Sequence, residues 1–102
     1  MKVRYRQTGG FGGLNFGSDL DSEQLPPNEA KELERLVQQA ALHRAGVKKS
    51  RGAGRDLADY EISVEDHGRT IRAAFDDMTI PGNVQPLLDF LRSRATARPL
   101  DD

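Results

Sequence analysis

Residues 60–75 alternate apolar and polar side chains in two stretches, and a turn sequence separates them. The turn, Asp66-His67-Gly68, has the composition of a tight connection between antiparallel strands. A period of two places the apolar side chains of a strand on one face. The segment therefore predicts a hairpin with one solvated face and one face that the rest of the chain must cover. The apolar positions are Tyr60, Ile62 and Val64, then Ile71, Ala73 and Phe75.

A second hairpin is predicted at the start of the chain. Val3 and Tyr5 alternate with basic side chains, and Leu14 and Phe16 alternate with small or polar ones. Between the two stretches, residues 9–13 contain four glycines around one phenylalanine. Glycine adopts backbone conformations that other residues avoid, so we expect a flexible hairpin tip here.

Two further segments have the apolar spacing of amphipathic helices. The first runs from Glu29 to about Arg44, with Asn28 as its expected N-cap, and the second follows Asn83, its expected cap. Leu42 would fall on the polar face of an unbroken helix, so either the helix loosens near Ala41 or Leu42 is exposed. The apolar positions are Leu33, Leu36, Val37 and Ala40, then Val84, Leu87, Leu88 and Leu91.

The predicted order of elements is β-β-α-β-β-α, which belongs to the α+β class. The simplest architecture is a four-stranded antiparallel sheet with two helices packed on one face. We expect residues 1–94 to form a single domain and residues 95–102 to form a flexible C-terminal tail. The uncovered face of the sheet would carry solvated charges with cross-strand pairs. These charges belong to Lys2, Arg4, Arg6 and Arg72, near Glu61 and Glu65.

Composition excludes several classes of function. The chain has 102 residues and no cysteine, so disulfides and thiolate chemistry are excluded. A net charge of −1 gives no general attraction to nucleic acid. No apolar run approaches the roughly 20 residues that span a bilayer, and the first residues do not read as a signal peptide. We therefore expect a cytoplasmic protein without nucleic-acid or membrane partners.

The polar residues do not predict a catalytic or metal site. His43 and His67 are far apart in the sequence, and a metal site needs three or four converging ligands. The neighbouring carboxylates of Asp76 and Asp77 fit the turned end of a strand better than an acid/base pair. The glycine-rich segment lacks the Gly-Lys-Ser/Thr ending of a phosphate-binding loop, and residues 46–55, with basic side chains within 48–55, read as a mobile, solvated loop. We expect no enzyme activity, no cofactor and no metal.

Protein binding is the function that the glycine-rich tip favours. Phe11 lies among glycines, where the backbone can approach a partner closely. Its ring could fill a pocket of that partner as an anchor, or it could fold inward and cap the core. The candidate contact residues at the tip are Gly10, Phe11, Gly12 and Leu14.

The order and spacing of these features resemble the emfourin family, which contains the inhibitor of protealysin and small bacterial relatives. The resemblance extends from Met1 to about Arg92. It departs from the family in the basic, glycine-containing residues 48–55, so the resemblance implies no role for them. The features that carry it are Gly9-Gly10-Phe11-Gly12-Gly13, Leu25-Pro26-Pro27, Glu32-Leu33 to Val37, Tyr60 to Asp66, Phe75-Asp76-Asp77, Ile80-Pro81 and Pro86 to Leu91.

The resemblance implies inhibition of thermolysin-like, protealysin-type zinc metalloproteases. It also implies a helix-and-sheet fold likened to plant cystatins. The Gln-x-Val-x-Gly signature of cystatins is absent, so inhibition of cysteine proteases is not implied. Such metalloproteases favour a bulky apolar residue just after the cleaved bond, a role for which Phe11 or Leu14 is suited. The alternative is a non-inhibitory interaction or regulatory module. In either case we expect a monomer when the protein is free.

Overall fold

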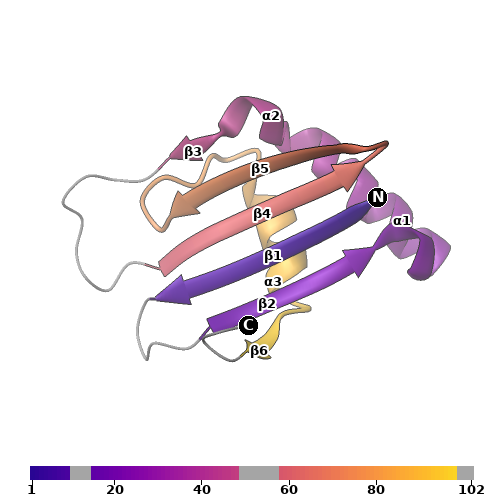
Figure 1. Ribbon diagram of the computed structural model, residues 1–102, viewed down its shortest axis with the longest axis horizontal. Coiled ribbons are helices and arrows are strands. Elements are labelled where there is room, and N and C mark those ends of the chain that lie inside the picture. Colours follow the sequence, from indigo (N-terminus) through magenta and orange to yellow (C-terminus); the bar gives the residue numbers. More distant parts are fainter. Residues whose placement is uncertain (10–14, 49–57, 99–102) are drawn as a thin grey trace.

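Four long antiparallel strands form the centre of the fold, in the spatial order β2-β1-β4-β5 (Figure 1). The computed structural model describes residues 1–9, 15–48 and 58–98. Helices α1 and α3 lie on one face of this sheet, which confirms the predicted α+β class, the β-β-α-β-β-α order and the layer arrangement. The long elements are β1 (Lys2–Gly9), β2 (Asn15–Asp21), α1 (Pro27–Ala40), β4 (Ala58–Asp66), β5 (Arg69–Asp76) and α3 (Gln85–Arg92).

Short elements that were not predicted complete the fold. A 3₁₀ turn, η1 (Ser22–Gln24), follows β2, and a single helical turn, α2 (Leu42–Ala45), follows α1. Two short strands extend the sheet at its edges. β3 (Val47–Lys48) pairs in parallel with β5, and β6 (Thr96–Arg98) pairs antiparallel with β2.

The two edge strands lie in segments that were predicted to have no regular structure. β3 falls within the segment from residue 46 that was predicted as a loop, and residues 49–57 of that segment lie outside the described residues. β6 falls within the predicted tail, so three residues of that tail are paired with the sheet. Backbone hydrogen bonds to a neighbouring strand can form such strands without an alternating pattern. The division of the chain into a domain and a tail stays a prediction.

The β4–β5 turn has the conformation that its sequence indicated. His67 and Gly68 both have positive φ, of 51° and 77°. A two-residue turn with positive φ at both positions matches the twist of the flanking strands, and glycine adopts it without strain. This turn sets the register in which Ile62 lies opposite Ala73 and Tyr60 lies opposite Phe75.

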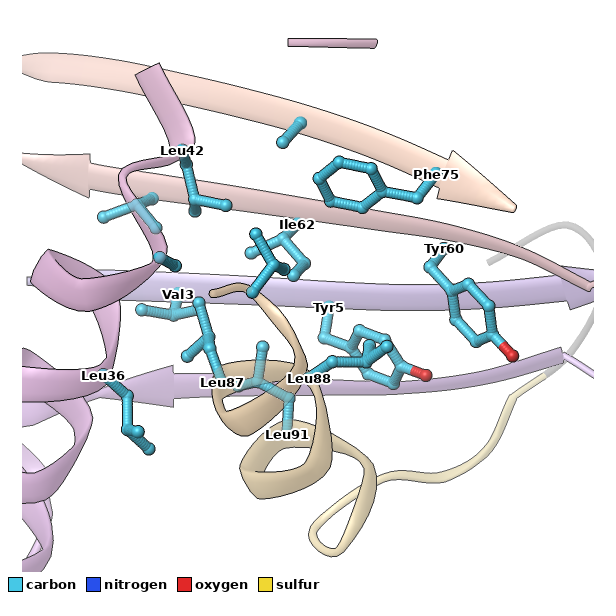
Figure 2. Close-up of a cluster of buried hydrophobic side chains, with 14 of the residues drawn as sticks. Val3, Tyr5, Leu36, Leu42, Tyr60, Ile62, Phe75, Leu87, Leu88 and Leu91 are labelled. Carbon is cyan, nitrogen blue, oxygen red and sulfur yellow. The ribbon is translucent and has the colours of Figure 1, made fainter. Parts of the chain in front are cut away.

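The core lies between the sheet and the helices (Figure 2). Tyr5 of β1, Ile62 of β4 and Phe75 of β5 point toward α3, which contributes three buried leucines. Each of these side chains comes from the apolar side of a predicted strand or helix, so the predicted buried faces are confirmed. The α3 leucines are Leu87, Leu88 and Leu91.

The first helical segment breaks where its pattern failed. Ala41 adopts a left-handed conformation between α1 and α2, with φ of 47° and ψ of 52°. The break rotates the following turn, so Leu42 is only 3% exposed and joins the core. Of the two alternatives that the sequence left open, the loosened helix is therefore the correct one.

Both predicted N-caps were wrong. The N-cap of α1 is Pro26, without a side-chain cap bond, because the prolines start the helix two residues earlier than expected. The N-cap of α3 is Val84. The side chain of Asn83 instead donates to the carbonyl oxygens of Gln39 and Ala40, at 3.3 and 2.8 Å.

Candidate functional site

One end of the sheet receives the connection that carries the predicted contact residues. β1 ends at Gly9, opposite Ala58, and β2 begins at Asn15, opposite Arg98. We call this end, bounded by Gly9, Asn15, Ala58 and Asp76, the loop end (Figure 1). The candidate residues Gly10, Phe11, Gly12 and Leu14 themselves lie outside the described residues. Their two flanking residues, however, are fixed in the sheet by pairing.

Asp77 joins two strands at the loop end. One carboxylate oxygen, Oδ2, accepts a hydrogen bond from the backbone nitrogen of Ala58 at 2.8 Å. The other, Oδ1, accepts one from the hydroxyl of Tyr60. The start of β4 is thereby held to the residue that follows β5. Because β4 also pairs with β1, the bond supports the strand that leads into the candidate segment.

Tyr60 is a neutral hydrogen-bond donor in this arrangement. The pKa of Tyr60 is raised to about 12, mainly by burial and also by the hydrogen bond to Asp77 and its negative charge, while the charge of Arg92 lowers it. The guanidinium of Arg92 on α3 lies over the Tyr60 ring, 5.8 Å from its centre. Tyr60 therefore connects β4, the β5–α3 connection and α3.

A second tyrosine lies on the neighbouring strand. The hydroxyl of Tyr5 donates to Oε1 of Gln7 at 2.6 Å, and burial raises the pKa of Tyr5 well above its usual range. Figure 2 shows the hydroxyls of Tyr5 and Tyr60 pointing toward the same end of the sheet, where the β1 arrow ends. Tyr5 and Tyr60 both occupy apolar positions of the predicted strands. A buried tyrosine needs a partner for its hydroxyl, so these two positions were the sequence signal that could have identified the pair.

A tight turn follows β5 at the same end. Asp76 is 4% exposed, and its Oδ1 accepts hydrogen bonds from the backbone nitrogen of Met78, at 2.8 Å, and from the hydroxyl of Thr79, at 3.2 Å. Asp76 and Asp77 thus bind different backbone and hydroxyl groups. This agrees with the interpretation of the two carboxylates as the turned end of a strand.

The uncovered face of the sheet carries paired charges. Arg72 contacts Glu61 at 3.0 Å across the β4–β5 pair, which is a cross-strand charge pair of the expected kind. Arg4 and Arg6 instead contact Asp19 of β2, at 3.4 and 3.2 Å. Asp19 was not singled out in the sequence because its place opposite Arg4 depends on the β1–β2 register. These exposed pairs are typical of a solvated surface.

The two histidines lie on the surface and far from each other in the sequence. His43 is exposed on α2, and the side chain of His67 is 92% exposed in the β4–β5 turn. Within the described ranges, no group of three or more His, Cys, Asp or Glu side chains is placed to hold a metal ion. Among the helices in the same ranges, none is long and apolar enough to cross a membrane.

These features first place the chain in a class of proteins. It is a small α+β protein whose longest connections lie at one end of an antiparallel sheet. The emfourin family model matches residues 5–92, from β1 through α3. The chain therefore belongs to the emfourin family. This is an inhibitor family, and membership is consistent with a protease-inhibitor role. No curated protein and no solved structure matches the chain.

Proposed function

We propose that this emfourin-family protein inhibits protealysin-like, thermolysin-type zinc metalloproteases by blocking the active-site cleft. The observation that carries the proposal is the family match over residues 5–92. The contact residues are Gly10, Phe11, Gly12 and Leu14, and no metal or catalytic group of the inhibitor takes part.

Apolar side chains on a glycine-rich segment suit such a cleft. A bulky apolar side chain, from Phe11 or Leu14, enters the pocket that accepts the residue after the cleaved bond. The glycines allow the backbone to approach the enzyme closely. Water and substrate are then excluded from the zinc by the inhibitor's own chain.

The loop end supports this role because it holds both flanks of the segment. The register pairs Gly9 with Ala58 and Asn15 with Arg98, and Asp77 holds Ala58 in place. A segment whose ends are already fixed loses less conformational freedom on binding than a free peptide does. The cytoplasmic location and the monomeric free state stay predictions.

Titration of the protein into a thermolysin-like protease tests the proposal. Peptide hydrolysis is followed with zinc in excess, so that chelation cannot mimic inhibition. We expect activity to fall stoichiometrically with added protein. Full activity at saturating protein, with an enzyme from the same organism, contradicts the proposal and favours a non-inhibitory interaction module.

The double variant Phe11→Ala/Leu14→Ala tests the contact residues. We expect the inhibition constant to rise at least tenfold, since removal of central apolar anchors typically costs more than 1 kcal/mol each. The matched control is Gln24→Ala/Arg69→Ala, which truncates two exposed side chains at the opposite end of the sheet. Unchanged inhibition by a folded double variant would show that the contact residues lie elsewhere.

A further inference from the structure

We infer that Met78 and Val47 form a second contact area for the same protease molecule, beside the candidate segment 10–14. This inference rests on the proposed function, and it names where the interface continues on the described surface. Its partner is an apolar surface of the protease next to the active-site cleft.

Met78 and Val47 are the exposed large apolar side chains of the described part of the chain. Each is 72% exposed, whereas the large aliphatic and aromatic side chains of the core cluster are buried. Both lie along the end of β5, because Val47 pairs with Ala74 and Met78 follows Asp76 by two residues. A single exposed apolar residue is common on a protein surface. Two of them at the end that also carries the candidate segment indicate a binding surface.

The turn that presents Met78 is firmly held. Its backbone nitrogen donates to Oδ1 of the buried Asp76, and the hydroxyl of Thr79 donates to the same oxygen. The backbone nitrogen of Thr79 also donates to the carbonyl oxygen of Asp76, at 3.1 Å. A side chain on such a turn is presented to a partner without the cost of ordering a loop.

The interface must be larger than the candidate segment 10–14, and β5 lies close enough to take part in it. A standard interface covers roughly 800 Å² and about 20–30 residues on each partner. The five residues 10–14 are too few to form it alone. Asp59 lies opposite both Thr8 and Asp76, so the ends of β1 and β5 are two strand spacings apart, which is about 10 Å. A protease bound over the segment therefore reaches the apolar side chains at the end of β5.

Methionine oxidation provides a direct test. The chain has two methionines, and Met1 lies at the opposite end of the sheet from the loop end (Figure 1). Its side chain is only 7% exposed in the folded protein, so Met1 is an internal reference outside the proposed contact area. We expect peroxide oxidation of Met78, followed by mass spectrometry, to slow several-fold in the protease complex while that of Met1 is unchanged. Equal Met78 rates in free and bound protein overturn the inference.

Substitution provides the second test. Met78→Glu places an unpaired charge in an apolar contact, and we expect the inhibition constant to rise roughly 30-fold because that charge loses water without gaining a partner. Met78→Leu keeps the apolar surface and should inhibit like the original protein. Gln24→Glu adds the same charge at the opposite end and is the matched control.

The outcomes separate this inference from the proposed function. If the unmodified protein binds no protease, both fail. If it inhibits and Met78→Glu inhibits equally well at an unchanged melting temperature, only the second contact area is wrong.

Discussion

Asn83 and Asn28 show how one residue type acts differently at two helix starts. Asn83 precedes α3 but binds the carbonyl oxygens of Gln39 and Ala40, which end α1. The last carbonyls of a helix lack partners within it, so this contact satisfies groups that would otherwise need water. Asn28 lies inside the first turn of α1, after the N-cap Pro26. The packing of α3 against α1 decides this difference.

Alanine substitution at the two asparagines should give unequal results. Asn83→Ala removes two hydrogen bonds, and we expect the free energy of unfolding to fall by about 1 kcal/mol. Asn28→Ala should change it by less than about 0.5 kcal/mol, as is usual for an exposed position. Denaturant unfolding measures both. Equal losses would mean that Asn28 caps α1 after all.

The break between α1 and α2 concerns two neighbouring elements, and it allows Leu42 to be buried. A continuous helix would leave Leu42 among polar side chains. The left-handed residue at Ala41 turns Leu42 into the core, and its backbone nitrogen bonds the carbonyl oxygen of Gln38. A left-handed conformation costs an L-residue roughly 1–2 kcal/mol. Burial of a leucine side chain returns about 1.5–3 kcal/mol, so the break is favourable.

Glycine should be favourable at Ala41 and unfavourable one residue earlier. Ala41→Gly relieves the left-handed strain, and we expect a gain of about 0.5 kcal/mol in the free energy of unfolding. Ala40→Gly, in the helix and fully buried, should lose about 1 kcal/mol or more. Thermal or denaturant unfolding measures whether each substitution raises or lowers the free energy of unfolding. A loss at Ala41 would contradict the conformation described for this residue.

For the molecule as a whole, the two buried tyrosines of the core make stability depend on pH. Tyr5 and Tyr60 lie on adjacent strands, and they are the only tyrosines of the chain. Burial is the largest cause of the raised pKa of each hydroxyl. In the unfolded chain both return toward the ordinary value of 10.0. Folding therefore excludes tyrosinate, so the stability of the whole domain is linked to pH on the alkaline side.

Alkaline titration should show this linkage. A raised folded-state pKa contributes stability that is fully present below pH 10 and is lost as the pH rises toward about 12. We expect tyrosinate absorbance to appear only together with loss of the circular dichroism of the fold. Tyr60→Phe, which leaves one tyrosine, should halve the absorbance change. Ionisation near pH 10 in a folded protein would contradict the burial of these hydroxyls.

At the loop end, sequence and structure contributed different parts of the candidate site. The candidate residues Gly10, Phe11, Gly12 and Leu14 came from composition and from family resemblance, and as contact residues they stay predictions. The contacts of Asp77 with Tyr60 and Ala58 could not be predicted, because they join residues that are 17 and 19 positions apart. Met78 gave no sequence signal at all, since only the tertiary structure shows whether an apolar side chain is exposed.

Patterns within the sequence were enough to predict the long strands, the two amphipathic helices and the turn at His67-Gly68. These features follow from the spacing of apolar residues and from backbone preferences, which act over a few neighbouring positions. The edge strands β3 and β6, the partners of Asn83 and the pairing of Arg4 with Asp19 depend instead on how the chain packs. Each of these contacts joins residues distant in the chain, and it forms only when the register of the sheet and the packing of the helices bring their atoms together.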